Sequence, residues 1–521
     1  MTNILWEKNV ESSGELAGRV VFIAGVGPQM ASATARIAIR EGASGILAAR
    51  SNTEPLAAEL RAAGGTAVAM TCDPTDKPSL REAVERGSAV PATRQSRSHR
   101  LTEIPLIALP KPETTMPIEA ASQEIPSVDA LIAKARKRTG LQDIGDPARN
   151  VGLEVFVESM GKEVWPTMTP RARELAVDYL VHQLEIRLRL IEDRARHAQI
   201  RQQKIESPLI VVGPPRSGST LLHKLISLDP DNRALEHWMC REPSPPLAAG
   251  PASSERLALA DKRMNDLFAL MPDVFVTHPY MIEEGTGALA ECGSDVLSIV
   301  TTSQQMWCFW GGDIYKQYLL EGDHTAALGF HHDFLQHLQW GNSGERWALK
   351  GSDHMLWMGE LAAQYPDAKL IWNHRDLAQQ LASLASVQSI LLGLRGHPVT
   401  AEQRKAQGAR AIELQRASVE KAMRSRKAIG DDRFIDVSYH DVMADPVQTI
   451  GRLYETCGLK MSNLHAQNIR DWTAAHQQTK HGVHKHSPDE FGMTGDDINE
   501  KFAPYTDKFG FGFGIRPELT V

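Results

Sequence analysis

The residues best suited to chemistry lie in segment 213–220, which reads Gly-Pro-Pro-Arg-Ser-Gly-Ser-Thr. Small residues let backbone N–H groups approach an anion, and a helix that begins near Ser219 would add the positive end of its dipole. The apolar run Leu209–Val212 that precedes the segment predicts a buried strand in a parallel sheet. We therefore predict a phosphate-binding loop between a strand and a helix.

Arg216 is the cation inside this loop. In the nucleoside-triphosphate loop GxxxxGK[ST], a Lys reaches the outer phosphates, but here Ser219 stands in its place. A guanidinium is planar, permanently charged and bidentate, so it suits holding an anionic group better than delivering a proton. This departure argues against a kinase or an ATPase.

A second stretch, Lys369–Ser386, predicts another buried strand followed by a turn and a helix. Together the two stretches resemble the sulfotransferases that use 3′-phosphoadenosine 5′-phosphosulfate (PAPS), particularly the bacterial group and the tyrosylprotein enzymes with PRSGTT-like loops. In that family an Arg at the strand end and a Ser eight positions later hold the 3′-phosphate, and Arg375 and Ser383 have this spacing. The resemblance also implies that the 5′-phosphosulfate is held by loop residues, namely Pro215, Arg216, Ser217, Gly218, Ser219 and Thr220.

The resemblance implies a fold and a reaction. The fold is α/β, a P-loop-type sulfotransferase domain with a central parallel sheet flanked by helices. The reaction moves a sulfuryl group from PAPS, a co-substrate, to a hydroxyl or amine of a small-molecule acceptor such as a phenol, sterol, lipid or sugar, and needs no metal. Two alternatives stay open: a P-loop kinase or ATPase, and a non-catalytic nucleotide-binding scaffold.

Catalytic candidates follow from two further likenesses. Lys350 and His354 match a segment that bacterial relatives carry just before the strand of the 3′-phosphate Arg. A free His has a pKa of about 6.5, which suits a general base for the acceptor hydroxyl, and Lys350 would neutralise charge on the sulfuryl group, as would Arg216. A His that only makes structural hydrogen bonds is the alternative. In tyrosylprotein enzymes a catalytic Glu lies at a distance past the loop where His237 stands here, beside Glu236.

The acceptor pocket is predicted from two weaker signals. A His followed by a Glu pair occurs in relatives and matches His278, Glu283 and Glu284. An aromatic cluster is typical of a core, and as an alternative it would form the apolar wall for an acceptor; its members are Trp307, Phe309, Trp310 and Tyr315.

Three histidines, His481, His484 and His486, fall within six residues and have the spacing of metal ligands. Relatives carry a His, a basic residue, Tyr and Ser here, followed by Phe-Gly. The resemblance therefore implies a lid that brings Lys485 toward the nucleotide phosphates, rather than a metal site.

The N-terminal segment alternates predicted strands and helices. Strands are expected within 16–25 and over 44–49 and 66–71, with helices over 31–41, 55–63 and 78–85. This pattern resembles a short-chain dehydrogenase/reductase, with Arg50 at the position that reads the NADP 2′-phosphate. The later fingerprint glycines are replaced and no Tyr-xxx-Lys set follows, so we expect a truncated Rossmann-like unit without dehydrogenase activity.

Composition sets the domain plan. The chain has 521 residues, 42% of them hydrophobic, and a net charge of −7, which argues against a general nucleic-acid binder. A Pro- and Ser-rich stretch predicts a linker, giving a Rossmann-like unit over 1–90, a linker over 91–126 and a sulfotransferase domain over 127–521. Helices are expected over 127–140 and 171–203. The apolar stripe of the second would pack on its own domain, with a homodimer contact as the alternative.

Cellular location is inferred from cysteines and hydropathy. The five cysteines form no CxxC pair or even framework, which favours a reducing cytoplasm. No signal peptide is evident, and no membrane span is expected because no apolar run approaches the roughly 18 residues that one requires.

Overall fold

The structure is a computed structural model of the chain. It describes residues 20–24, 39, 44–49, 54–62, 66–71, 124–250, 252–268, 271, 274, 284–342, 344–476 and 487–510. The chain divides into two compact units, Met1–Met116 and Pro117–Val521. The division falls inside the segment predicted to be a linker.

The N-terminal unit contains a small parallel sheet. Its strands β1 (Val20–Ala24), β2 (Ser44–Ala49) and β3 (Thr66–Thr71) pair in sequential order, and α2 (Glu54–Ala62) connects β2 to β3. The predicted strands and the helix of this β-α-β unit are thus confirmed. Of the helix predicted over 31–41 only Ile39 is described; the helix over 78–85 and the Arg50 position lie outside the described residues.

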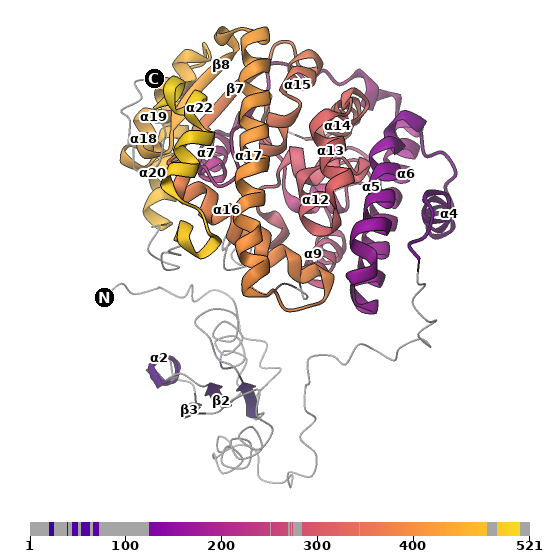
Figure 1. Ribbon diagram of the computed structural model, residues 1–521, viewed down its shortest axis with the longest axis vertical. Helices are drawn as coiled ribbons and strands as arrows, with labels where there is room; N and C mark the ends of the chain where they lie inside the picture. The colour runs from indigo at the N-terminus through magenta and orange to yellow at the C-terminus, as the bar shows by residue number, and fades with distance from the viewer. Residues whose placement is uncertain are drawn as a thin grey trace. The chain divides into compact units, whose positions relative to one another are not determined.

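The larger unit is organised around a five-stranded parallel sheet, as predicted (Figure 1). The strands lie in the order β5-β6-β4-β7-β8, and they are β4 (Leu209–Val212), β5 (Asn232–Ala234), β6 (Arg346–Lys350), β7 (Lys369–His374) and β8 (Phe434–Ser438). β4 pairs with both β6 and β7, with Val211 opposite Lys350 and Val212 opposite Trp372. Because parallel strands end at the same edge, the segments after β4, β6 and β7 come together there.

Both faces of the sheet are covered, so its central strand is apolar throughout. Successive strand side chains point to opposite faces. Leu209 and Val211 pack in a cluster with α7 (Ser219–Ser227), α19 (Pro446–Thr456) and α20 (Asn463–Ala475). Ile210 and Val212 belong to the larger core on the other face, which includes α16 (Leu377–Leu391).

Helices form the rest of this unit. Figure 1 shows α18–α20 beside β8, and α4–α6 at the opposite side. The remaining helices are α4 (Val128–Thr139), α5 (Val151–Ser159), α6 (Pro170–Arg196), α8 (His237–Arg241), α9 (Ser254–Phe268), α12 (Gln304–Trp310), α13 (Asp313–Glu321), α14 (Thr325–Gln339), α15 (Met358–Gln364), α17 (Ala401–Ile429), α18 (Tyr439–Ala444), α21 (Gly495–Lys501) and α22 (Ala503–Phe509).

The two helices predicted before the sheet are present. Ser127 caps α4 by accepting a hydrogen bond from the Ala130 N–H at 3.3 Å, and Gly140 ends the helix at φ +73°. In α6 the apolar stripe that includes Leu180, Leu184 and Leu188 is buried within the chain's own core. Dimerisation stays a prediction.

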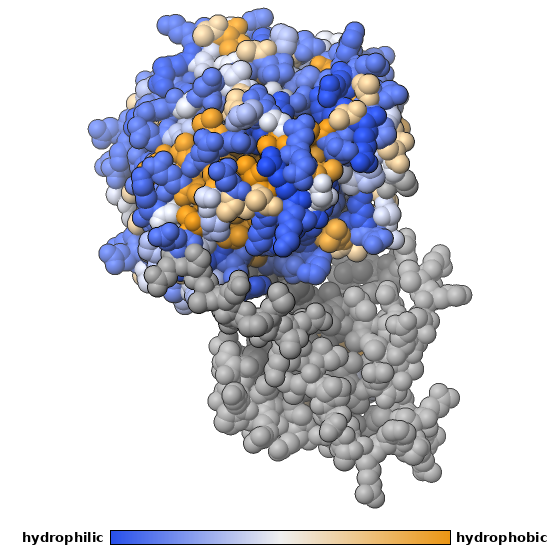
Figure 2. Space-filling view, turned by 90° about the vertical axis from the view of Figure 1, so that its right-hand side faces the viewer, coloured by the Kyte–Doolittle hydropathy of each residue, from blue (hydrophilic) through white to orange (hydrophobic). Residues whose placement is uncertain are grey.

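One helical stretch in the described residues, Leu377–Arg395, is long and apolar enough by composition to cross a membrane. By length and composition this stretch departs from the expectation that no apolar run approaches the length of a membrane span. Within the fold 72% of its apolar window is buried, as in the core helix of a globular domain. Figure 2 shows one face of the larger unit as mostly hydrophilic, with a band of apolar residues across it.

Candidate active site

The loop between β4 and α7 depends on two glycines. Gly213 has φ +132°, and a Cβ there would come within 2.7 Å of the Asn373 carbonyl oxygen. Gly218 has φ +92°, and a Cβ there would lie 2.3 Å from the Tyr439 ring. Arg216 itself adopts φ +68°, which a side chain rarely tolerates. The loop therefore follows a tight path that its small residues permit, and α7 begins at Ser219 as predicted.

The end of β7 holds this loop in place. Asn373 donates a hydrogen bond from Nδ2 to the Ser217 carbonyl oxygen at 2.7 Å. Arg375, just after the strand, donates from Nη1 to the Arg216 carbonyl oxygen at 3.3 Å. Neighbouring parallel strands thus fix the loop before any ligand is bound.

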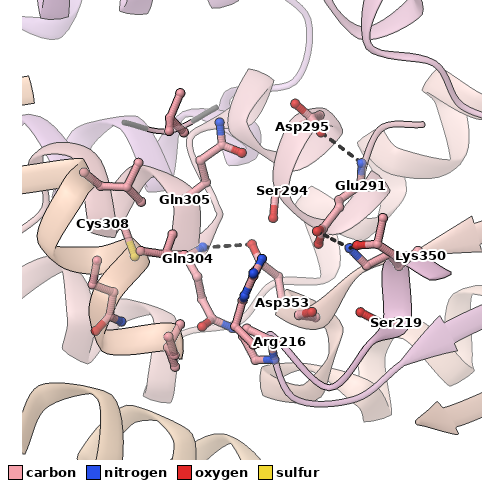
Figure 3. Close-up of a pocket in the computed structure, with 18 of the residues that line it drawn as sticks. Arg216, Ser219, Glu291, Ser294, Asp295, Gln304, Gln305, Cys308, Lys350 and Asp353 are labelled. Atoms are coloured by element: carbon pink, nitrogen blue, oxygen red, sulfur yellow. Dashed lines mark hydrogen bonds and ion pairs between the residues drawn. The ribbon is translucent and has the colours of Figure 1, made fainter. Parts of the chain in front are cut away.

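A cavity of about 370 Å³ opens at this edge of the sheet (Figure 3). Its wall includes most of the predicted anion-binding residues: Pro215, Arg216, Gly218, Ser219, Thr220, Lys350 and Arg375. Ser217 is buried and does not line it. Ser383 also lies off the wall, where its Oγ accepts a hydrogen bond from Arg216 Nε at 3.0 Å.

Lys350, the last residue of β6, lies beside the loop. Its Nζ donates to Thr220 Oγ1 at 3.0 Å and forms an ion pair with Glu291. Only 4% of Lys350 is exposed, so its charge acts in a poorly hydrated environment. Arg216, Lys350 and Arg375 therefore bring three cations to one cavity from the ends of three adjacent strands.

His237 also lines the cavity, at the first position of α8. Its Nδ1 lies 3.5 Å from Asp295 Oδ1 and 3.2 Å from Arg241 Nη1. Its buried Nε2 has no hydrogen-bond partner among the described residues. Burial alone would raise the pKa of Asp295, but the charge and hydrogen bond of His237 outweigh it and lower that pKa to about 2. Asp295 is thus a carboxylate beside the imidazole.

His354 and Glu236 do not line the cavity. His354 is fully buried; its Nδ1 accepts from Trp357 Nε1 at 3.3 Å, and its Nε2 lies 3.1 Å from Cys292 Sγ. Burial lowers its pKa to about 3, so the ring is neutral. Glu236 accepts from Trp238 Nε1 at 2.5 Å. The structure therefore gives both residues contacts away from the loop.

Asp353, the neighbour of His354, lines the cavity instead. Its Oδ2 accepts from the Gln304 backbone N–H at 2.8 Å, an interaction that Figure 3 marks with a dashed line. Burial, helped by the charge of Glu291, raises the pKa of Asp353 to about 7. This carboxyl group therefore changes charge near neutral pH.

One described group of side chains could hold a metal ion. Cys292, His331 and His354 are buried, and their ligand atoms lie within 4.8 Å of one another. The indole of Trp357 can only donate, so His354 Nδ1 accepts and the proton of the ring sits on Nε2, facing Cys292. A metal on Nε2 would displace that proton, so these contacts favour a hydrogen-bonded cluster.

The structure describes some of the other predicted residues and not the rest. His278, Glu283 and Lys485 lie outside the described residues, as do the three histidines of the predicted lid. Glu284 pairs with Lys224 at 3.0 Å. The aromatic cluster is buried as predicted for a core, and Phe309 also contributes to the cavity wall.

Sequence reasoning missed Glu291, Asp295 and Asp353. Glu291 lies near the end of the stretch that contains the predicted acids Glu283 and Glu284. Asp353 is the neighbour of His354, the predicted base. The sequence shows that each residue lies in or beside one of these motifs. It does not show in which direction the side chain points.

The sheet, the glycine-containing loop and the cations at the strand ends define a protein with the α/β fold of sulfotransferases. Residues 208–463 match the model of the sulfotransferase family. Two solved structures are similar to this chain. Sulfotransferase STF9 from Mycobacterium avium has 28% identity and a TM-score of 0.65 over 75% of this chain and 98% of its own. Sulfotransferase STF1 from Mycobacterium tuberculosis H37Rv has 25% identity and a TM-score of 0.58 over 74% and 100%.

No curated protein gives a significant match. The family match and the structural neighbours support sulfotransferase activity. The family match begins at residue 208, so the likeness of the N-terminal unit to dehydrogenases stays a prediction.

Proposed function

We propose that this chain transfers a sulfuryl group from PAPS to a hydroxyl group of a small-molecule acceptor. The observation that carries the proposal is the common cavity of Arg216, Lys350 and Arg375, which come from the ends of three adjacent strands. PAPS is anionic at both its 5′-phosphosulfate and its 3′-phosphate. Separate cations on one wall suit such a ligand.

The 5′-phosphosulfate would lie against the first turn of α7. The N–H groups of Ser219 and Thr220 open this helix and have no acceptor within it. Lys350, already 3.0 Å from Thr220 Oγ1, would bind the bridging oxygen and neutralise the charge that develops there. Arg216 would hold the sulfuryl oxygens.

The 3′-phosphate would bind Arg375. Ser383 would contribute through Arg216, whose Nε its hydroxyl holds at 3.0 Å. In the proposal Lys485 supplies a further cation from a lid over the nucleotide.

The transfer step is an in-line displacement at sulfur. The acceptor oxygen forms a new S–O bond while the bond between sulfur and the bridging phosphate oxygen breaks. The hydroxyl proton passes to a base, and adenosine 3′,5′-bisphosphate leaves with the electron pair. Both products remain anionic until release.

We assign the base to His237. It lines the cavity, its Nε2 is unpaired among the described residues, and Asp295 faces its Nδ1. In this role the ring carries its proton on Nδ1, toward Asp295, and Nε2 takes the proton of the acceptor hydroxyl. Arg241 can only donate, so it then pairs with Asp295 and not with Nδ1. Arg241, 3.8 Å from Asp295, balances the carboxylate charge.

Ligand choice tests the donor. Adenosine 3′,5′-bisphosphate should raise the melting temperature of the full chain, whereas ATP with Mg²⁺ should not. The reverse order would favour a kinase or an ATPase. Transfer of ³⁵S from labelled PAPS to a panel of phenols, sterols and sugars then tests the reaction itself, and a protein that binds the nucleotide without transferring or hydrolysing PAPS would be a scaffold.

A further inference from the structure

We propose that the acceptor is an uncharged, mostly apolar alcohol or phenol with a second oxygen atom, which binds the side-chain amides of Gln304 and Gln388. This inference rests on the proposed sulfuryl transfer and names the class of molecule that receives the group. It is carried by the half of the cavity that lies away from the anion-binding loop.

That half of the cavity has an apolar wall. Figure 3 shows Cys308 and Gln305 on the side of the cavity opposite Lys350 and Ser219. The apolar lining comes from α9, α12, α16 and the segments between, namely Phe268, Val274, Leu289, Phe309, Leu384, Val387 and Leu391. Burial raises the pKa of the Cys308 thiol to about 12, so this side chain is also uncharged. Such a wall gains free energy by covering rings or alkyl chains.

Two glutamines interrupt this wall. Gln304 on α12 is 7% exposed and Gln388 on α16 is 3% exposed, and both line the cavity. The Nε2 of Gln304 has no hydrogen-bond partner among the residues that the structure describes, and the neighbour of the Gln388 amide is the Cys308 thiol, which is a weak hydrogen-bonding group. Buried amides without partners cost free energy. A carbonyl oxygen on the acceptor would accept from the Nε2 groups of the two side chains, and a hydroxyl could also donate to Gln388 Oε1.

Charge on the wall argues against an anionic acceptor. Glu291 is paired with Lys350, and Asp295 with His237 and Arg241. In the described part of the chain, the charges that act on the Asp353 carboxyl group are those of two other acids, Glu291 and Asp295, and no cation is among them. An anionic acceptor would therefore meet an unbalanced carboxyl group, while the cations near the loop are occupied by the donor.

A matched panel of acceptors tests this class. With ³⁵S-labelled PAPS and the full chain, we would compare 4-alkylphenols, the same phenols with a ketone at successive chain positions, hydroxyphenylalkanoates, phenolic amines and hexoses. At least one ketone should exceed its alkylphenol in kcat/KM by about tenfold or more, because it pairs the buried amides. The carboxylates should be about 100-fold poorer than the matched ketones.

Leucine substitutions test the two amides, since they keep the length of the side chain. Gln388→Leu and Gln304→Leu should each lower kcat/KM for the preferred ketone by about 10- to 100-fold, with little change for the alkylphenol. Gln380→Leu is the control. Gln380 lies on the same helix and its buried amide is also unpaired in the described structure, but it is not on the cavity wall. It should leave the ketone preference unchanged.

The two proposals fail in different ways. Preferred sulfation of hexoses, amines or carboxylates would overturn the acceptor class and leave sulfuryl transfer intact. So would an equal loss for ketone and alkylphenol. A protein that hydrolyses PAPS but sulfates no compound in the panel would also overturn the acceptor class. A protein that binds adenosine 3′,5′-bisphosphate without transferring or hydrolysing PAPS would be a scaffold and would overturn the proposed function. Absence of both nucleotide binding and product would overturn the proposed function, and this inference with it.

Discussion

Arg375 donates a hydrogen bond from Nη1 to the backbone carbonyl oxygen of Arg216, across 3.3 Å. The guanidinium carbon of Arg375 lies 4.3 Å from the centre of the Tyr439 ring, and this ring packs against Gly218. Two motifs that lie far apart in the sequence are therefore one structural unit. A change at the end of β7 reaches the loop after β4.

Removing this guanidinium should weaken nucleotide binding. Arg375→Gln should reduce affinity for adenosine 3′,5′-bisphosphate by about 10- to 100-fold, because it loses both a charged contact and a support of the loop. Isothermal titration calorimetry measures the effect. Arg404→Gln, at an exposed position on α17, is the matched loss of charge and should bind normally. Equal binding by both variants would contradict the assignment.

The two candidate histidines should behave differently. His237→Gln should lower kcat by about 100-fold or more if it removes the base. His354→Gln should change kcat little and should lower the free energy of unfolding by about 1–3 kcal/mol, since it disturbs contacts with Cys292 and Trp357. Single-turnover rates and urea denaturation separate the two effects. A large rate loss confined to His354→Gln would return the base to that residue.

Asp353 should make nucleotide affinity depend on pH. Its pKa of about 7 means that the carboxyl group is neutral below this pH and negative above it. Above pH 7 it should therefore repel the anionic donor. Asp353→Asn should bind adenosine 3′,5′-bisphosphate about 3- to 10-fold more tightly than the wild type at pH 8 and equally at pH 6. The wild-type comparison cancels titration of the ligand, so parallel pH profiles would refute this role.

Buried neutral histidines should destabilise the fold in acid. Burial lowers the pKa of His223 to about 4 and that of His354 to about 3. An unfolded His binds a proton below about pH 6.5, so each such group costs about 1.4 kcal/mol per pH unit between that pH and its folded pKa. Asp353 acts in the opposite direction, but His324 and His337 add to the loss.

The urea concentration at the midpoint of unfolding should consequently decrease as the pH is lowered from 6.5 to 4.5. Unfolding of the His223→Gln variant should take up about one proton fewer over this pH range, because Gln does not titrate. Its free energy of unfolding should therefore decrease less steeply as the pH is lowered. A midpoint that stays level over this range would show that these rings are not held neutral.

The cluster of Cys292, His331 and His354 should not depend on metal. The proton on His354 Nε2 and the donor from Trp357 satisfy the ring without an ion. Addition of Zn²⁺, or dialysis against a chelator, should leave the melting temperature unchanged. A rise with Zn²⁺ that Cys292→Ala abolishes would instead identify a metal site.

Local sequence signals determined much of the fold. The four apolar residues of β4 end at Gly213, so the limits of the strand and the start of α7 were predictable. Lys350 and Arg375 were predictable as neighbours of the loop, because parallel strands of one sheet end at a common edge. Ser127 and Gly140 likewise marked the ends of α4.

Side-chain direction limited the prediction of the site. His354 and Asp353 are adjacent in a 3₁₀ turn, and only the turn decides which of them enters the cavity. Glu291 precedes the π-helical turn Cys292–Val296 and Asp295 lies within it, and the path of this turn depends on its packing. Gln304 and Gln388 reach the same cavity from two different helices, and no local motif encodes this tertiary arrangement.

The double pairing of β4 ties ligand binding to strand alignment. A slip of one residue along β4 would move the loop by about 3.3 Å and exchange the side chains that face the two cores. Lys350 and Arg375 would stay behind, because they belong to other strands. A nucleotide that contacts the loop, Lys350 and Arg375 together would therefore stabilise the correct register of β4 with its two neighbouring strands. Selection for tight donor binding would then also select for correct alignment of these central strands.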